Sequence, residues 1–459
     1  MMRVLTTLLS PREVGRVSLI LTTTAFFALF LINPVGMFIN RRLHAWKESG
    51  FGRHYLTNYL TYLILVGFVS AVILPLFSMT GWINFGTPTS WLIVLVAGSI
   101  IFNTINQTSV PSLNLLGHSQ WFVLLSLSTL FASFLFATLL AKFIQPVAQY
   151  WLLGVLLGQV LLGFVGTKVL FSQLPNEKIP HEYPRIQKRH LNALFSFAWP
   201  VAISAGLGWV QGQGYRYILK EHLGFAQLGL FTAGYGISAG MISAFESILT
   251  TYFQPRLYRD VNTSHTAEQI KAWQRYALAV IPSLLLTVAL IMVLAPELTQ
   301  TFLGANFQSA KNYVVWGAIA EAARVLMGVY SLIAHVYMRT QWLILPSVVG
   351  ALLSVTLCIG LLPGFGAAGA GMALTLAGFA VVVIMHFMLA GRMGGEIPIQ
   401  PILLAGISAA GLWVATIGLR HIVETTTSGI KIIEFILPIG ILYLALLYLF
   451  LRKHINQAI

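Results

Sequence analysis

The sequence contains very little charge. Only 9% of its 459 residues are Asp, Glu, Lys or Arg, whereas 57% are hydrophobic and the mean hydropathy is +0.81. Soluble domains carry about 25% charged residues because their surfaces face water. A chain this long with so few charges cannot cover itself with a hydrated surface. We therefore predict a polytopic membrane protein and exclude the soluble, disordered and fibrous classes.

Acidic residues are the scarcer kind of charge. The chain has 13 Asp and Glu against 27 Lys and Arg, a formal net charge of +14. Two interpretations are open. Basic residues retain loops on the cytoplasmic side of a membrane by the positive-inside rule, and a basic excess also suits an anionic substrate or lipid headgroup. In a membrane protein the excess does not indicate nucleic acid, and we expect no nucleic-acid partner.

Residues and motifs of enzyme chemistry are also missing. Cys358 is the only cysteine, so the chain can form no intrachain disulfide and no cysteine-based metal site. The sequence has no P-loop, no HExxH motif and no Ser–His–Asp set in a suitable loop. Its longest loops, near 172–194 and 255–276, are short and basic. We therefore predict a protein that is not an enzyme and that holds no metal or cofactor.

Long apolar runs fill most of the chain. A membrane helix needs about 20 apolar residues, and we predict an all-α protein with about thirteen such spans. They lie at 17–39, 55–78, 90–112, 120–141, 147–171, 195–216, 226–250, 277–295, 312–334, 342–362, 367–390, 401–419 and 433–451. The loops richer in Lys and Arg are cytoplasmic by the positive-inside rule, which places residue 1 outside and residue 459 inside. Arg3, Arg12 and Arg16 in the N-terminal tail oppose this assignment.

The sequence repeats itself at an offset of about six helices. A Leu-x5-Gly segment at 9–15 recurs at 223–229, and a Gln-Trp pair at 120–121 recurs at 341–342, offsets of 214 and 221. An even number of helices gives both halves the same orientation. The pseudo-two-fold axis then runs along the membrane normal, as in transporters built from parallel repeats.

The repeat predicts two lobes around a central cavity. We expect an N-terminal lobe of about five helices at 1–171, a basic cytoplasmic linker at 172–193, a C-terminal lobe of six helices at 194–391 and two extra helices at 392–459. The second lobe opens with a span that has no counterpart in the first lobe. The sequence therefore predicts that one helix is missing at the front.

Polar residues follow one face of the predicted helix at 312–334. At steps of three and four, this face carries Gly317, Glu321, Arg324, Gly328, Ser331 and His335. Glu321 and Arg324 are three residues apart and can form an ion pair. Charges at membrane depth are costly and indicate function by default. The pair either holds helices together or lines a cavity, where it would bind substrate or titrate during transport.

Other helices carry similar polar residues. The repeat partner of 312–334 has Asn103, Gln107 and Asn114 on the corresponding face. The span at 226–250 carries on one face Thr232, Gly236, Ala239, Ser243, Glu246 and Thr250. Glu246 is the only acid in this span, and an isolated buried carboxylate can exchange a proton or hold a cation. Arg216, at the end of the span at 195–216, either snorkels to the membrane interface or faces the cavity.

Several loose motifs of glycine and apolar residues are spread over nearly the whole chain. They are LSPREVG at 9–15, FAWP at 197–200, YRYIL at 215–219, LGFAQLGLF at 223–231, FLGANFQSA at 302–310 and LPGFGAAGAGMA at 362–373. By these motifs the chain resembles the polysaccharide transporter branch of the multidrug/oligosaccharidyl-lipid/polysaccharide (MOP) exporter superfamily, the Wzx-type O-antigen and exopolysaccharide flippases. The resemblance implies two six-helix lobes around a central cavity, often with two final helices. The predicted spans fit this pattern if the first helix is missing.

The resemblance implies alternating-access translocation of a polyprenyl-diphosphate-linked oligosaccharide across the bacterial inner membrane, for surface polysaccharide synthesis. Arg324 and Arg216 would bind the diphosphate, because a guanidinium donates paired hydrogen bonds to phosphate. Arg41 and Arg42, at the cytoplasmic end of the first span, would recruit the substrate.

The remaining polar residues receive roles on the same basis. Asn103, Gln107 and Asn114 would bind sugar hydroxyls. Glu321 would neutralise Arg324 in the empty cavity, and Glu246 is the candidate for proton or sodium coupling, with Glu321 as a second. A polysaccharide polymerase and glycosyltransferases would be the protein partners.

Three alternatives belong to other classes. A cation-coupled drug or metabolite exporter of the MATE type would need acids in the first lobe, and the first five predicted spans contain no central acid. A membrane-embedded glycosyltransferase or polymerase would need a large outer loop, which the sequence lacks. A scaffold without transport would leave the polar faces without a purpose.

Overall fold

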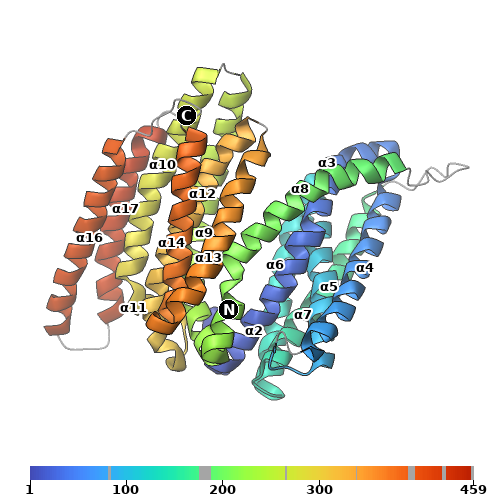
Figure 1. Cartoon of the computed structure of the whole chain (residues 1–459), viewed down its shortest axis with the longest axis horizontal. Coiled ribbons are helices and arrows are strands. Elements are labelled where there is room, and N and C mark those ends of the chain that lie inside the picture. The colour runs from blue at the N-terminus through green and yellow to red at the C-terminus, as the bar shows by residue number, and fades with distance from the viewer. Residues whose placement is uncertain are drawn as a thin grey trace, which may run out of the picture. The chain divides into compact units, whose positions relative to one another are not determined.

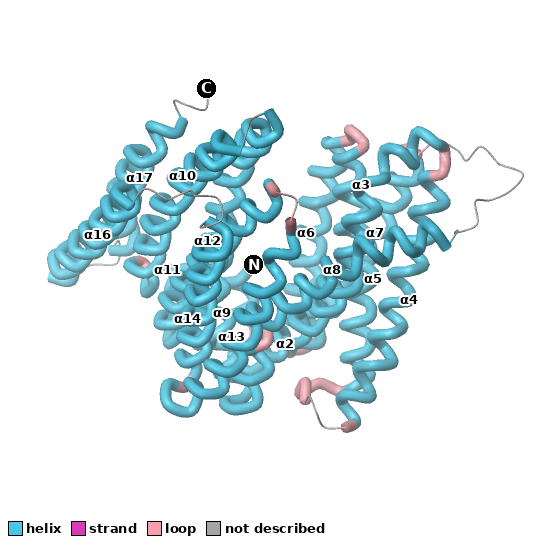
Figure 2. Tube along the Cα trace, turned by 45° about the horizontal axis from the view of Figure 1, so that its top comes forward, coloured by secondary structure: helices cyan, strands magenta, loops and turns pink. Residues whose placement is uncertain are grey.

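The computed structural model is almost entirely helical over the residues that it describes (Figure 2). It describes residues 1–459 except 81–83, 175–187, 264–265, 338, 391–398, 426–430 and 456–459. Within the described ranges the chain contains no β-strand. The predicted all-α class is confirmed.

Contacts between Cα atoms divide the chain into two compact units. The first unit contains Met1 and Arg3–Gly229, and the second contains Met2 and Leu230–Ile459. The helix Lys188–Gln213 (α8) falls in the first unit because it packs against the helix Asn33–Ser49 (α3) and the π-helical turn Ala28–Ile32 (η1) of that unit. The lobes and linker drawn from the repeat are a different division of the chain and stay a prediction.

The first unit contains a long helical stretch, α2 to α3, that a π-helical turn interrupts. The elements of this unit are α1 (Met2–Leu8), α2 (Pro11–Phe27), the π-helical turn η1 (Ala28–Ile32), α3 (Asn33–Ser49), α4 (Gly52–Met79), α5 (Thr89–Leu115), α6 (Ser119–Phe143), α7 (Ala148–Ser172) and α8 (Figure 1). Ser10 starts α2, since its Oγ accepts the N–H of Glu13, and proline follows at the first helical position, where it needs no hydrogen-bond partner.

The helix α9 (Tyr215–Thr263) passes from the first unit into the second and bends at Gly224, which has a φ of +80°. This positive φ favours glycine. The second unit continues with α10 (Thr266–Val293), α11 (Ala295–Phe302), η2 (Ala305–Ala310), α12 (Lys311–Val336), η3 (Thr340–Leu343), α13 (Ile344–Phe365), α14 (Ala367–Met385), η4 (His386–Ala390), α16 (Ile399–Thr425) and α17 (Lys431–Ile455).

The two units use the same neighbour pattern internally. In the first unit α6 packs on α7, α5 on α7 and α4 on α5; in the second α13 packs on α14, α12 on α14 and α10 on α12. This correspondence supports the internal repeat. The two C-terminal helices α16 and α17 pack on α10, where the hydroxyls of Thr287 and Tyr443 lie 2.9 Å apart.

Ten helical stretches of the described residues are long and apolar enough to cross a membrane. One of them, Leu194–Val261, is 68 residues long and contains two predicted spans, 195–216 and 226–250. Shorter apolar helices at Gln400–Thr416 and Pro438–Arg452 lie where the last two spans were predicted. The count of thirteen is therefore not confirmed, whereas the multi-pass architecture is.

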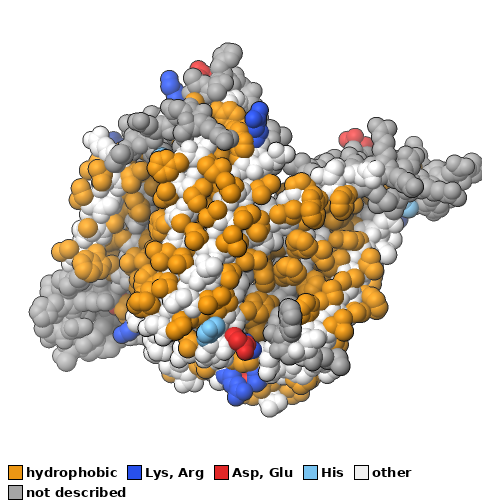
Figure 3. Space-filling model, in the orientation of Figure 1, with side chains coloured by type: hydrophobic (Ala, Val, Ile, Leu, Met, Phe, Trp, Pro, Cys, Tyr) orange, Lys and Arg blue, Asp and Glu red, His pale blue; other side chains and the backbone are white. Residues whose placement is uncertain are grey.

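Large apolar side chains cover much of the outer surface (Figure 3). Phe68, Phe131 and Phe164 of the first unit are 66%, 67% and 65% exposed, and Phe387 and Ile407 of the second are 73% and 68% exposed. Soluble monomers rarely expose such extended apolar surface. In a membrane these side chains would contact lipid tails.

The repeated glycines at the start of α2 and within α9 lie against each other. A Cβ on Gly15 would collide with the carbonyl oxygen of Phe225, and a Cβ on Gly229 would collide with the carbonyl oxygen of Pro11. Small residues permit such close backbone approach in membrane helices. The sequence repeat therefore marks a crossing of two equivalent segments.

This crossing predicts that Gly229→Ala destabilises the protein. The added methyl group has to push the two backbones apart, and overpacking of this kind costs about 1–3 kcal/mol. Thermal unfolding in detergent measures the effect. Gly240→Ala on the same helix is the matched control, because a Cβ there meets nothing within 4 Å. Equal melting temperatures for the two variants would contradict the tight crossing.

Candidate functional site

Four side chains of the second unit form one charged hydrogen-bonded cluster. Arg324 on α12 donates from Nε to Glu321 at 2.5 Å and from Nη2 to Glu246 on α9 at 2.7 Å. Tyr235 on α9 donates its hydroxyl to the other oxygen of Glu321 at 2.6 Å. We call these four residues the charge cluster. It joins α9 to α12 through the guanidinium.

A glycine on α12 brings the two helices together. A Cβ on Gly317 would lie 3.0 Å from the Cα of Tyr235, so the missing side chain allows the helices to approach. Ser238 on α9 donates to the carbonyl of Val314 on α12 at 2.6 Å in the same region. This close packing places Tyr235 within reach of Glu321, one turn further along α12.

Exposure increases across the charge cluster. The side chain of Glu321 is 7% exposed, that of Glu246 is 26% exposed and that of Arg324 is 44% exposed. Glu321 and its tyrosine partner therefore form the fixed end. Arg324 and Glu246 form the accessible end, where a solute can reach them.

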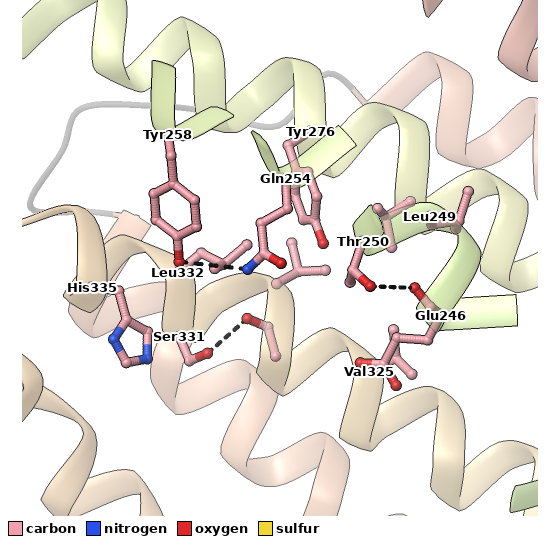
Figure 4. A pocket seen from close by; sticks show the side chains of 13 residues that line it. Glu246, Leu249, Thr250, Gln254, Tyr258, Tyr276, Val325, Ser331, Leu332 and His335 are labelled. Atoms are coloured by element: carbon pink, nitrogen blue, oxygen red, sulfur yellow. Dashed lines mark hydrogen bonds between the residues drawn. The ribbon is translucent and has the colours of Figure 1, made fainter. Parts of the chain in front are cut away.

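The accessible end adjoins a cavity of about 280 Å³ between α9, α10 and α12. Its polar lining includes Glu246, Thr250, Gln254, Tyr258, Ser331 and His335 (Figure 4). The cavity extends along α9 from Glu246 to Tyr258, about three helical turns. Tyr276 borders it and also a smaller crevice, in which Asp260 lies 3.3 Å from Arg275 and 4.0 Å from Arg256.

The structure brings together two polar faces that the sequence indicated separately. Glu246 and Thr250 come from the face on α9, and Gly328, Ser331 and His335 come from the face on α12. One expectation was wrong: Glu246 is not an isolated carboxylate, because Arg324 of the neighbouring helix pairs with it. Spacing along one helix cannot show which helix lies opposite.

The charges of the cluster do not cancel. With both carboxylates ionised, two negative charges face one positive charge, which leaves the cluster at −1. Arg324 already donates to both carboxylates, so an incoming anion has to compete for it. The surplus negative charge suits a proton or a monovalent cation. In the described part of the chain no three His, Cys, Asp or Glu side chains gather as a metal site would require.

Arg216 lies in the first unit and has a different environment. It donates from Nη1 to the hydroxyl of Thr22 on α2 at 2.7 Å and from Nε to the hydroxyl of Tyr215 at 3.2 Å. It lies within ion-pair distance of no carboxylate among the residues that the structure describes. Arg216 is therefore held by neutral partners.

The amide residues of α5 divide into two groups. Asn103 accepts from Gln107 at 3.4 Å and from Gln159 of α7 at 3.3 Å, whereas Asn114 is exposed. Buried Asn106, which the sequence did not single out, donates to the carbonyl of Gln159 at 2.7 Å. The two bonds to Gln159 join α5 to α7.

Arg41 and Arg42 lie on α3, but their side chains are outside the described residues.

Tyr235 is the functional residue that sequence reasoning missed. It lies three residues after Thr232 and four before Ala239, so it shares the polar face of α9. Aromatic residues on a membrane helix usually pack against apolar neighbours. The sequence alone therefore does not indicate that the Tyr235 hydroxyl bonds to a carboxylate.

The family model for polysaccharide biosynthesis proteins matches residues 4–312, more than half of the chain. The chain belongs to this family. The resemblance inferred from the motifs is thereby confirmed at the family level. A comparison with curated proteins finds no sequence match.

Two solved transporter structures are similar to this chain in fold. An inward-facing MATE-family multidrug resistance transporter of the MOP superfamily matches with a TM-score of 0.66 and 14% identity, over 85% of this chain and 92% of that chain. The lipid II flippase MurJ in an inward closed conformation matches with a TM-score of 0.62 and 14% identity, over 97% of this chain and 98% of that chain. The fold is that of MOP transporters.

The charge cluster predicts a specific pattern of stability. Arg324→Gln leaves Glu246 and Glu321 without their shared cation, which we expect to cost about 2 kcal/mol, between the values for exposed and buried ion pairs. Replacing both acids by glutamine in the Arg324→Gln background removes the repulsion and restores part of the stability. Thermal unfolding in detergent measures both effects, with Arg339→Gln as the exposed control. A triple variant less stable than Arg324→Gln would contradict this prediction.

Proposed function

We propose that the protein translocates a polyprenyl-diphosphate-linked oligosaccharide between the leaflets of a bacterial inner membrane, by alternating access, during surface polysaccharide synthesis. One observation carries the proposal: a member of a polysaccharide biosynthesis family has the fold of MOP transporters over nearly its whole length. The MurJ match adds support, since that protein is a lipid II flippase. We do not assign an enzymatic activity to the chain.

The cargo explains why polar side chains lie at membrane depth. A diphosphate with sugar hydroxyls cannot cross hydrocarbon cheaply, because each polar group that loses its hydrogen bonds costs several kcal/mol. The cavity beside the charge cluster offers hydroxyl, amide and imidazole groups to such a headgroup. Two arginines, Arg256 and Arg275, lie in the adjoining crevice around a single aspartate. This basic end would admit the anionic headgroup.

The charge cluster would act as the exchange point. A diphosphate oxygen can replace a carboxylate on the guanidinium, since both accept its paired N–H groups. Protonation of Glu246, or binding of sodium to it, weakens its pair with Arg324 and frees Nη2 for the phosphate. Coupling of this kind ties cargo binding to a cation. Glu321, held by Tyr235, would keep Arg324 in place.

The other predicted residues keep subordinate roles in this proposal. Arg41 and Arg42 would recruit the lipid carrier, and Asn103, Gln107 and Asn114 would bind sugar hydroxyls. Glycosyltransferases would supply the lipid-linked oligosaccharide and a polymerase would consume it.

A cation-coupled exporter of the MATE type is the second candidate. The net charge of −1 at the cluster favours a cationic solute, and the MATE transporter match has a TM-score of 0.66. Such an exporter would confer resistance to cationic dyes such as ethidium. The flippase would not.

The proposal predicts that Arg324→Gln reduces surface polysaccharide in cells that depend on this protein for it. We expect a loss of about tenfold or more, because a hydrogen bond to a charged group contributes about 1.5–3 kcal/mol. Polymer output at matched protein level is the measurement. Arg339→Gln is the control, since Arg339 contacts Trp342 outside the cavity. Normal polymer output from Arg324→Gln, or ethidium resistance that depends on Glu246, would argue for the second candidate.

A further inference from the structure

A second cavity, of about 420 Å³, lies in the first unit between α2, α4, α8 and the start of α9. Its walls are almost entirely apolar and are rich in aromatic rings: Phe26, Phe27, Phe77, Phe85 and Trp209. An apolar cavity of roughly 150 Å³ is sufficient to bind benzene. This second cavity, which we call the groove, can therefore hold a longer hydrocarbon segment.

Arg216 lies beside the groove without lining it, directly before Tyr217, which does line it. The Nη1 of Arg216 donates to the hydroxyl of Thr22, and Trp209 of the groove donates its indole N–H to the carbonyl of the same threonine at 3.1 Å. The next residue, Thr23, lines the groove and lies 2.7 Å from the hydroxyl of Tyr217, which also lines it. Two adjacent threonines therefore connect the guanidinium to the apolar wall.

Arg216 differs in its partners from two other arginines of the described chain. Arg16 in the same unit pairs with Glu13 at 2.6 Å, and Arg324 in the second unit pairs with two acids. Arg216 has hydroxyl partners and, in the described part of the chain, no acid. A cation near the end of a membrane helix is stabilised by an anion, by hydrogen bonds or by extending to the interface. An anionic ligand beside the groove would add charge pairing to the two hydroxyl contacts of Arg216.

We propose that this groove binds the isoprenoid chain of a polyprenyl phosphate, with Arg216 on the phosphate. The inference rests on the proposed function and adds to it a lipid-binding site on the first unit, apart from the headgroup cavity of the second unit. The ligand carries an anion at one end of an apolar chain, which is the combination that the groove and Arg216 provide.

The chemistry of the groove favours an isoprenoid over a bilayer acyl chain. Methyl branches and fixed double bonds leave an isoprenoid fewer rotatable bonds than a saturated chain of equal length. Fewer rotors are immobilised on binding, so the entropic cost is smaller. The rigid, branched units can also pack flat against aromatic rings such as Phe26 and Trp209.

Photolabelling of the full-length protein in liposomes tests the site. The probes are a diazirine-bearing geranylgeranyl phosphate, the corresponding uncharged alcohol and a diazirine-bearing phosphatidic acid, with labelled peptides identified by mass spectrometry. We expect the isoprenoid phosphate to label the α2 and α4 segments that line the groove, near Phe26 and Phe77. It should exceed the phosphatidic acid there by about tenfold, a ratio that corresponds to about 1.4 kcal/mol.

Two kinds of variant separate the phosphate from the chain. Arg216→Gln should lower labelling by the phosphate about tenfold, close to the level of the alcohol, whereas Arg216→Lys should retain part of it. Ile73→Trp fills the groove and should lower labelling by both isoprenoid probes. Leu76→Trp is the matched control, because Leu76 lies on the same helix, is 58% exposed and does not line the groove.

The labelling results test lipid binding in the groove, and a separate translocation measurement tests the proposed function. Equal labelling by phosphatidic acid, or undiminished labelling of Ile73→Trp, would show an ordinary bilayer lipid position and overturn the inference. If Ile73→Trp fails to fold, Phe77→Ala, at a 40% exposed position, should shift the labelled residues instead; unshifted labelling would count against the site. Translocation of lipid-linked oligosaccharide in the same liposomes is measured independently. Specific labelling without translocation would reject the proposed function and retain the groove.

Discussion

The cost of charge inside a membrane is the constraint on which this structure depends. Arg324 is stabilised there by two carboxylates, from its own helix and from α9, and Tyr235 holds one of them. The arrangement positions α9 against α12 and leaves Arg324 and Glu246 at the edge of a polar cavity. The same contacts that make the charges tolerable thus place them where a solute can compete for the guanidinium.

Each unit contains an arginine beside a cavity, and the partners of the two arginines differ. In the first unit, Arg216 lies among hydroxyls beside an apolar groove, whereas in the second unit an arginine lies among acids beside a polar cavity. The two units share a pattern of helix packing, and the side chains that this packing brings together differ between them.

Sequence reasoning succeeded where a local pattern determines the structure. Apolar run length identified the helical membrane class. The repeated Leu-x5-Gly segment predicted an internal repeat, and the structure shows that its two glycines cross. The polar faces on α9 and α12 were recognised from steps of three and four. It failed where tertiary packing decides: the partner of Glu246 lies on another helix, and the bond between Asn103 and Gln159 joins two helices.

Movement of a lipid-linked oligosaccharide across a bilayer is the activity that we propose for this protein. The most direct measurement uses the purified native protein in liposomes with a fluorescent polyprenyl-diphosphate oligosaccharide in the inner leaflet. A membrane-impermeant quencher reports the arrival of the headgroup outside. We expect protein-dependent arrival of the headgroup that a proton or sodium gradient accelerates. Arrival at the rate of protein-free liposomes, under either gradient, would contradict the proposed activity.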